Sequence, residues 1–407
     1  MNQSQTKLWT KDFILASSVN FLLTLVFYLL MVTMALYAVE EFDASTSEAG
    51  LITGIFIVGT LFGRLYIGRM IDIIGRKRTL VIGLIFFTLT TLLYFINLGL
   101  PVLLVTRLIH GMALGMASTA AGTIVAQVIP PTRRGEGIGY YSMSATLATA
   151  IGPFIGLYMS QITSFQTIFA FCLALGVVCL LVGLLVRVPK LAPISKTAEA
   201  AIEAKGFKLS NFIEPKALPI ALITMLIAFC YSSILSFINF YAIEIDLVET
   251  ASFFFVVYAV AVLLSRPFTG RLMDAKGANF VMYPAFFLFA AGLMLLSTVT
   301  TGVMLLMAGV LIGLGFGNMQ SSTQTIAVKL TEPHRLGLAT STFFIALDAG
   351  LGFGPYLLGF VVPVLGFEKL YVVLAIVILL TAVLYYFLHG KKEKKAFAGI
   401  KSATIQE

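Results

Sequence analysis

The chain has 407 residues, of which 59% are apolar and 11% are charged, with a formal net charge of +8 and a mean hydropathy of +0.99. Soluble domains carry about 25% charged residues, so this composition excludes a cytosolic enzyme, a disordered regulator and a secreted disulfide scaffold. The three cysteines, Cys172, Cys179 and Cys230, lie in apolar runs and are predicted to be core residues without a disulfide framework.

A helix needs about 20 apolar residues to cross about 30 Å of hydrocarbon. Twelve stretches meet this requirement, and no cleavable signal peptide is expected before the first, which would itself direct insertion. In chain order they lie near 13–38, 49–70, 79–97, 101–129, 137–159, 165–187, 217–242, 251–272, 280–299, 302–328, 337–361 and 368–388.

Basic residues gather on one side of these predicted spans. Arg76, Lys77 and Arg78 follow the second span, and Arg133 and Arg134 follow the fourth, whereas the opposite loops carry acids and a single base, Lys369. Because basic loops stay in the cytoplasm, we expect a multi-pass protein of the plasma membrane with both termini cytoplasmic. The positive charge then reflects topology, and no nucleic-acid partner is expected.

One long polar stretch divides the spans into six and six. It predicts an N-terminal six-helix bundle at 1–188, a cytoplasmic linker at 189–216, and a C-terminal six-helix bundle with a basic cytoplasmic tail at 217–407. Two halves of equal size suggest an internal duplication, in which matching residues recur at a fixed spacing.

The two halves repeat at a shift of 202 positions. Matched residues in the second and eighth spans are Arg64, Gly68, Arg69, Asp72 and Gly75 with Arg266, Gly270, Arg271, Asp274 and Gly277. Other matches are Gly111 with Gly313, Gly115 with Gly317, Arg133 with Arg335, and Gly152-Pro153 with Gly354-Pro355. Parallel six-helix repeats are typical of transporters that hold substrate between the halves. We therefore predict an all-α membrane protein, with twelve transmembrane helices as two six-helix repeats around a central cavity.

These motifs resemble those of the major facilitator superfamily. The stretch from Gly68 to Arg78 resembles its signature loop, Arg107 to Gly111 its helix-four signature, and Gly152 to Gly156 the signature associated with antiporters. The resemblance extends over the whole chain. Within the superfamily, the chain resembles the twelve-helix drug/proton antiporter branch. Gln127 stands where the family often has an acid, which weakens any charge relay from Asp72 to that position.

The resemblance implies a monomeric secondary active transporter that works by alternating access. It implies export of small organic or drug-like molecules in exchange for protons, as in multidrug resistance. An uptake symporter or facilitator for a specific metabolite is the alternative on the same scaffold. A membrane-embedded enzyme or lipid-handling protein is a further alternative, but we find no catalytic cluster at one membrane face.

A carboxylate at a helix end can accept backbone N–H bonds from a neighbouring helix and pair with nearby bases. Glycine permits close helix contact and proline bends a helix. A cytoplasmic gate is therefore predicted; the alternative is that the bases only set orientation and Asp72 caps a helix. The gating candidates are Gly68, Arg69, Asp72, Gly75, Arg76, Lys77, Gly152, Pro153 and Asp274.

Charged residues deep in a span are functional candidates, because the membrane interior disfavours them. Asp348 lies about 20 Å along its helix from Arg335, where a carboxylate can take up and release a proton; Glu136 is the reserve. The alternative for Asp348 is a carboxylate neutralised by a fixed partner, with a chiefly structural role. Arg107 and His110 share a helix face. For Arg107 the resemblance implies proton transfer or substrate contact, against a brace to carbonyls of the first span; for His110 the alternative is packing.

Uncharged polar and aromatic residues complete the predicted site. They suit an amphipathic or cationic molecule, although most such residues in a chain with 34 phenylalanines face lipid or fill seams between helices. The substrate candidates are Asn20, Tyr28, Met31, Tyr231, Asn239, Asn318, Gln320 and Gln324. The sequence contains no Walker phosphate loop, and we predict no ATP drive, no cofactor, no metal and no catalytic residue. The expected partners are a small-molecule substrate, protons and membrane lipid.

Overall fold

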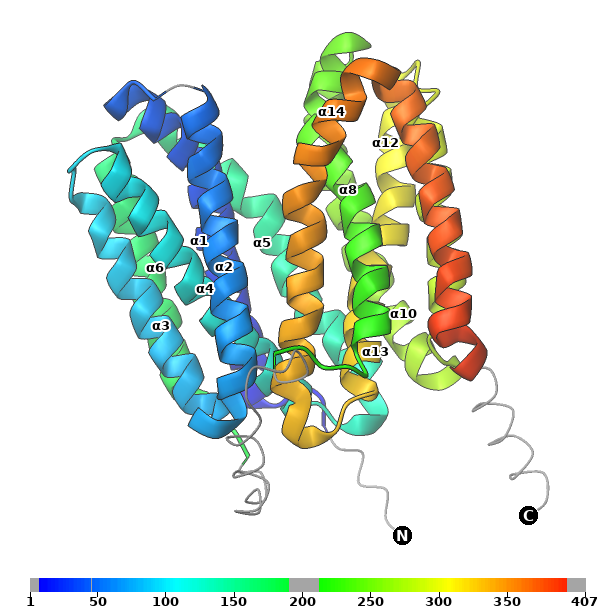
Figure 1. The fold of residues 1–407 in the computed structure, drawn as a ribbon, viewed down its shortest axis with the longest axis horizontal. Helices are drawn as coiled ribbons and strands as arrows, with labels where there is room; N and C mark the ends of the chain where they lie inside the picture. Colours follow the sequence, from blue (N-terminus) through cyan, green and yellow to red (C-terminus); the bar gives the residue numbers. More distant parts are fainter. Residues whose placement is uncertain (1–6, 45, 190–211, 394–407) are drawn as a thin grey trace. The chain divides into compact units, whose positions relative to one another are not determined.

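The computed structural model describes residues 7–44, 46–189 and 212–393, and within those ranges every regular element is helical (Figure 1). The first elements are α1 (Lys11–Phe42), α2 (Thr46–Ile74), α3 (Arg76–Leu92), η1 (Leu93–Phe95), α4 (Leu100–Val128), η2 (Pro131–Arg133), α5 (Arg134–Ile162) and α6 (Phe165–Leu185). The later ones are α8 (Leu218–Glu244), α9 (Val248–Ala251), α10 (Phe254–Lys276), α11 (Asn279–Leu296), α12 (Gly302–Ile312), η4 (Gly313–Gly317), α13 (Asn318–Lys329), η5 (Pro333–Arg335), α14 (Leu336–Tyr385) and η6 (Tyr386–Gly390).

Eleven helical stretches of the described chain are long and apolar enough to span a membrane. The last, at 333–393, has 61 residues and would be about 90 Å long as one straight helix, three times the hydrocarbon thickness. It bends at Gly366, where φ is 72°, a left-handed value that glycine adopts without strain. Figure 1 shows the chain reversing direction within α14. This stretch therefore contains the eleventh and twelfth predicted spans.

Local sequence signals set several helix ends. Thr10, Ser164 and Thr301 are N-caps whose side chains accept a backbone N–H from the first turn of α1, α6 and α12. Pro101 and Pro219 lie in the first turn of α4 and α8, where the missing N–H has no helical partner to lose. The ends observed lie within a few residues of those predicted.

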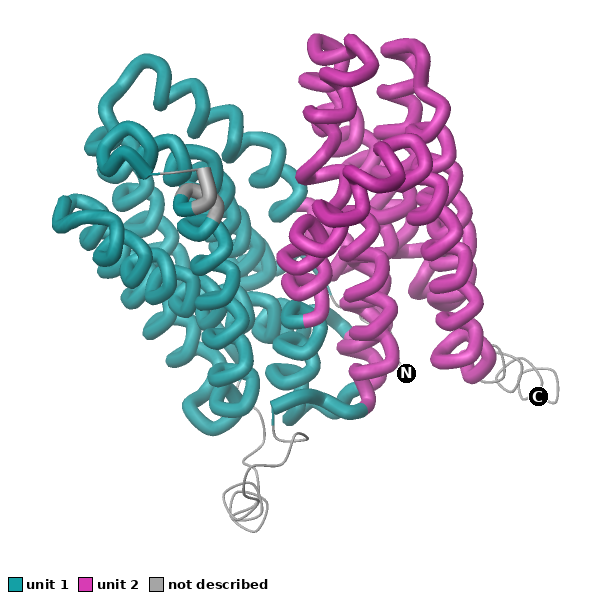
Figure 2. The backbone as a smooth tube through the Cα atoms, turned by 45° about the horizontal axis from the view of Figure 1, so that its top comes forward, with its two compact units in different colours: residues 1–130, 144–215, 331–345 teal, residues 131–143, 216–330, 346–407 magenta. Residues whose placement is uncertain are grey.

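The chain forms two compact units (Figure 2). Unit 1 comprises Met1–Pro130, Ser144–Pro215 and Thr331–Ile345; unit 2 comprises Pro131–Met143, Lys216–Leu330 and Ala346–Glu407. The start of α14 thus packs in unit 1, and the start of α5 packs in unit 2. Most of the linker predicted at 189–216, and the tail from 394, lie outside the described residues.

Matched glycines hold matched helix pairs together in the two units. In unit 1, a Cβ atom on Gly111 of α4 would lie 2.1 Å from the carbonyl oxygen of Phe56 in α2. In unit 2, a Cβ on Gly313 would lie 2.7 Å from the carbonyl oxygen of Tyr258 in α10. Phe56 and Tyr258 are themselves 202 positions apart. The repeat seen in the sequence is therefore a repeat of helix contacts.

Gly111→Ala is expected to lower the free energy of unfolding by about 1–3 kcal/mol, because a methyl group must push two packed backbones apart. Gly54→Ala, on α2, is the control: nothing lies within 4 Å of its added Cβ, and alanine favours helix by up to ~1 kcal/mol. Thermal unfolding midpoints of the two variants in detergent check this. Equal midpoints would show that the α2–α4 contact tolerates the methyl group.

Candidate functional site

An ion pair between a buried arginine and a half-buried aspartate lies at the end of α2. Arg76 Nε donates to Asp72 Oδ1 at 2.9 Å, and Nη1 donates to Gln127 Oε1 of α4 at 2.9 Å. Nη2 donates to the carbonyl oxygen of Pro333, and Asp72 also accepts the backbone N–H of Gly337. The Arg76 side chain is 3% exposed. This cluster, the Asp72 site, joins α2, α3 and α4 to the start of α14.

A second carboxylate cluster lies at the end of α10 in unit 2. Asp274 accepts the backbone N–H groups of Gly135 at 2.8 Å and Glu136 at 2.9 Å, and it pairs with Lys329 at 2.8 Å. We call this cluster the Asp274 site. Its carboxylate binds the first N–H groups of α5, which have no partner within the helix.

Glu136 forms two further ion pairs at the Asp274 site. Its side chain is 5% exposed and contacts Arg133 at 2.7 Å and Arg271 at 2.8 Å. The reserve candidate for proton coupling is thus held between two bases, and it ties the start of α5 to α10 a second time.

The two sites are built alike but take their base from different helices. Asp72 matches Asp274, and Gly337 matches Gly135. Arg76, however, is matched by Ala278, and Gln127 is matched by Lys329. Among the described residues, each carboxylate therefore forms an ion pair with one base, supplied by α3 in unit 1 and by α13 in unit 2.

Glycine again allows close contact at both sites. A Cβ on Gly68 of α2 would lie 2.5 Å from the Ser341 side chain of α14, and a Cβ on Gly135 would lie 2.6 Å from the carbonyl oxygen of Gly270 in α10. Ser341 Oγ donates to the carbonyl oxygen of Arg64 at 2.7 Å. The starts of α14 and α5 therefore lie directly on α2 and α10.

The remaining gating candidates are Gly75, Arg69, Lys77, Gly152 and Pro153. Gly75, at φ 98°, forms the turn between Asp72 and Arg76. The guanidinium of Arg69 lies 5.1 Å from the ring centroid of Phe212. Lys77 Nζ donates to the carbonyl oxygens of Gly183 and Leu184, so it caps the C-terminal end of α6. Gly152, beside Pro153 in α5, packs against Tyr28 and Leu25 of α1.

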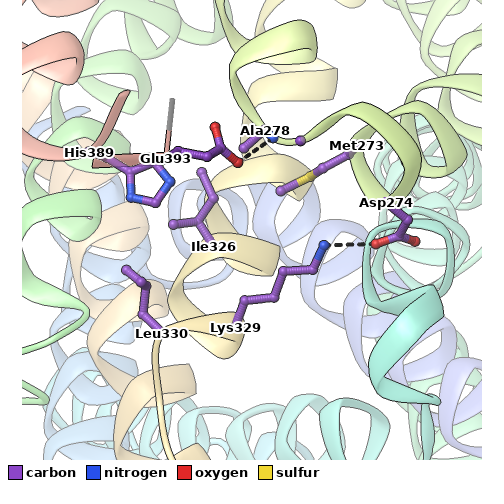
Figure 3. A pocket seen from close by; sticks show the side chains of 9 residues that line it. Met273, Asp274, Ala278, Ile326, Lys329, Leu330, His389 and Glu393 are labelled. Carbon is purple, nitrogen blue, oxygen red and sulfur yellow. Dashed lines mark hydrogen bonds and ion pairs between the residues drawn. The ribbon is translucent and has the colours of Figure 1, made fainter. Parts of the chain in front are cut away.

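A cavity of about 160 Å³ lies beside the Asp274 site (Figure 3). Lys329 points to Asp274 on one side, and Glu393 lies on the other with His389 nearby. Glu393 accepts the backbone N–H groups of Ala278 at 2.6 Å and Asn279 at 2.8 Å, which caps α11. The cavity adjoins Ala278, which occupies the position matched to Arg76.

Arg107 and His110 lie together in the interior of unit 1, and neither is exposed. Arg107 donates to the carbonyl oxygen of Ile52 at 3.3 Å and to Tyr94 at 3.4 Å, and it lies 4.3 Å from the ring centroid of Phe56. The Tyr94 hydroxyl is 2.8 Å from His110 Nδ1. This geometry braces α4 against α2, whereas the alternative drawn from sequence was a brace to the first span.

The remaining candidates are divided between the units. In unit 1, Asn20 is buried and donates to Ser144 of α5 at 2.9 Å, while Tyr28 and Met31 are half-buried on α1. In unit 2, Gln324 is buried on α13, Asn239 is exposed on α8, and Asp348 is half-buried on α14.

Three substrate candidates of unit 2 meet near the π-helical turn η4. Tyr231 stacks on Phe316 of that turn, with ring centroids 3.9 Å apart. Asn318 binds Ser265 and Thr269, and Gln320 accepts from Arg266 at 3.4 Å. Arg266 also donates to the carbonyl oxygen of Gly317 at 3.0 Å. The Asn318 carboxamide is thus engaged within unit 2.

The family model of the Major Facilitator Superfamily matches residues 16–348 and 248–406 of this sequence. The chain belongs to the Major Facilitator Superfamily. Among its relatives, an uncharacterized MFS-type transporter of Methanocaldococcus jannaschii is 29% identical over 361 residues, which cover 87% of this chain and 92% of that protein. The quinolone resistance protein NorA of Staphylococcus aureus is 26% identical over 198 residues, 48% of this chain and 49% of NorA.

Solved transporters of the superfamily share the fold. The human organic anion transporter MFSD10 superposes with a TM-score of 0.72 at 16% identity, covering 92% of this chain and 98% of that one. The E. coli fucose:proton symporter FucP superposes with a TM-score of 0.73 at 15% identity, with the same coverage. The predicted fold class and family are confirmed: this is a multi-pass membrane transporter of the superfamily and not an enzyme.

Proposed function

We propose that the chain is a proton-coupled exporter of small organic, drug-like molecules. It acts by alternating access in the plasma membrane, as a monomer with both termini cytoplasmic. The observation that carries alternating access is the pair of matched carboxylate contacts, Asp72 with the start of α14 and Asp274 with the start of α5.

These contacts act as the cytoplasmic gate. With functional halves at 1–188 and 217–407, each contact joins a helix of one half to a helix start of the other. A carboxylate that accepts helix N–H groups binds through charge-assisted bonds, which hold while the gate is closed and break as it opens. The glycines beside each carboxylate permit the approach. Bending at Gly152-Pro153 and Gly354-Pro355 accommodates the movement.

Asp348 is the proposed proton carrier. It is an acid within a membrane span, where ionisable residues mark proton and substrate pathways. An inward proton driven by ~100 mV releases about 2.3 kcal/mol, which is available for export. Arg107 and His110 brace unit 1 near α4, and Glu136 acts at the Asp274 site.

The substrate is a small organic molecule with apolar surface. The candidates with apolar or aromatic surface are Tyr28 and Met31 on α1 and Tyr231 on α8, residue types that suit such a molecule. Polar contacts come from Asn20, Asn239, Asn318, Gln320 and Gln324. Gln320, which is half-buried and accepts from Arg266, is the amide that we expect to form a hydrogen bond with the substrate.

Export is favoured over uptake by the similarity to NorA, a quinolone resistance protein, and by the antiporter-like Gly152-Pro153 pair. An uptake symporter is the alternative mode. FucP, which shares the fold, is a fucose:proton symporter. The two modes predict opposite sidedness for substrate-driven proton movement.

Everted membrane vesicles with an acidified lumen distinguish the modes. Lipophilic cations, dyes and antibiotics added outside, on the cytoplasmic face, are expected to release luminal protons, reported by a pH-sensitive dye. Vesicles from cells without the chain give the background. If only compounds preloaded in the lumen release protons as they leave, the chain is a symporter. If no compound moves protons from either side, proton-coupled drug export is wrong.

A further inference from the structure

The Asp72 site lacks the carboxylate that holds two bases at the Asp274 site. In unit 2, Glu136 pairs with both Arg133 and Arg271. The shift of 202 takes these two bases to Arg335 and Arg69, but it takes Glu136 to Leu338. Unit 1 therefore has the same two bases with a leucine in place of their shared acid.

The chain just before α8 supplies partners for both bases. Glu214 Oε2 accepts from Arg335 Nε, and Phe212 lies under the guanidinium of Arg69 at 5.1 Å. The Glu214 side chain is 3% exposed, against 38% for Arg335. The backbone N–H of Glu214 also donates to Thr342 Oγ1 at 2.9 Å, so this segment contacts α14 through backbone and side chain.

These contacts surround the place where α14 lies on α2. Ser341, next to Thr342, donates to the carbonyl oxygen of Arg64, and the Arg64 guanidinium lies 4.4 Å from the ring centroid of Phe344. The short segment 212–214 therefore contacts two bases, Arg69 on α2 and Arg335 just before α14. All of these residues belong to unit 1.

We propose that Phe212 and Glu214 replace Glu136 at the Asp72 site, and that Glu214 is a positioning residue that keeps the start of α14 on α2. A buried carboxylate is strongly disfavoured without a partner, so the ion pair with Arg335 helps to hold Glu214 in place. Glu136 lies in the same helix turn as its partner Arg133, whereas Glu214 comes from the connection between the predicted halves. The described end of that connection, at 212–214, therefore helps to set how readily the Asp72 site opens, which rests on the gating role proposed above.

Cysteine labelling measures this opening without a transported substrate. Ser341 is fully buried in the contact, so Ser341→Cys, in a chain with Cys172, Cys179 and Cys230 replaced by alanine, reports opening by its rate of reaction with a maleimide. Glu214→Gln is expected to raise that rate about tenfold, because it removes a charge-assisted bond. Glu332→Gln, a nearby acid whose side chain is 54% exposed, is expected to leave it unchanged.

A charge reversal separates the pair from general damage. Glu214→Arg combined with Arg335→Glu is expected to bring the labelling rate back to within about threefold of the parent, since the ion pair is re-formed. Glu214→Asp is expected to lie between Glu214→Gln and the parent. If Glu214→Gln is not recovered as a folded chain, Thr342→Val removes the bond to the Glu214 backbone and should raise the rate about threefold.

The outcomes divide clearly. A parental labelling rate in Glu214→Gln overturns the proposal. So does a reversed pair that labels as fast as Glu214→Arg or Arg335→Glu alone. Asp72→Asn in the same background tests the gate itself. Faster labelling in Asp72→Asn without an effect of Glu214→Gln leaves the gate standing and removes Glu214 from it; no effect of either removes the gating role as well.

Discussion

Asp348→Asn is expected to abolish substrate-driven proton release from everted vesicles. The amide has nearly the same shape as the carboxyl group but cannot take up or release a proton, and positioned proton-transfer groups contribute about 10²–10⁴-fold to a rate. Position 146, which the repeat matches to 348, is a threonine, so the first half offers no second acid at this place. We therefore expect the signal to fall to that of vesicles without the chain.

Two controls separate lost coupling from lost binding. Asp348→Glu keeps a carboxyl group and is expected to retain a measurable part of the proton release. Exchange of labelled for unlabelled substrate across the membrane needs no net proton movement, so Asp348→Asn should still catalyse it. Proton release at the parental rate in Asp348→Asn would mean that another group carries the proton, and Glu136→Gln would then be the variant to measure.

Most of the fold could be predicted from the lengths of the apolar runs and from the spacing of the glycines. Each predicted span corresponds to one continuous helical stretch or to one leg of α14, and the tenth comprises α12, η4 and α13, because the length needed to cross a membrane is a local property of sequence. The repeat predicted that Gly111 and Gly313 occupy equivalent positions, and in the structure they meet the backbones of the matched residues Phe56 and Tyr258. Glycine is informative because the missing Cβ lets a neighbouring helix approach closely, as the backbones of Phe56 and Tyr258 do here.

Charge partners were much less predictable. Asp72 and Asp274 were recognised from their motif, but Lys329, Glu214 and Glu393 were not assigned to any site, because their partners are far away in sequence. A signal was present in the repeat itself. Where Arg76 is matched by Ala278, the lost base is restored at Lys329, and where Glu136 is matched by Leu338, an acid enters from Glu214. Such mismatches between halves identify positions whose role has moved to another segment.

Asp72→Asn is expected to destabilise the chain far more than Asp274→Asn, although the two positions match in the repeat. Arg76, the partner of Asp72, has a side chain 3% exposed, and removing one partner of a buried pair costs about 3–5 kcal/mol. Lys329, the partner of Asp274, is 34% exposed and can turn to water, so its lost pair should cost about 1 kcal/mol or less. Thermal unfolding of both variants in detergent, beside the parent, gives the comparison.

A second substitution, at Arg76, tests this explanation. If Asp72→Asn is harmful because it leaves the buried Arg76 guanidinium without a negative charge, then adding Arg76→Gln removes that charge and should recover about half or more of the lost stability. Adding Lys329→Gln to Asp274→Asn should change little, since that base is 34% exposed and can be solvated once the pair is lost. Equal destabilisation by the two single variants, or no recovery in Asp72→Asn with Arg76→Gln, would show that the carboxylates act through the helix N–H groups of Gly337 and Gly135. The two gates would then differ in sequence but be alike in energy.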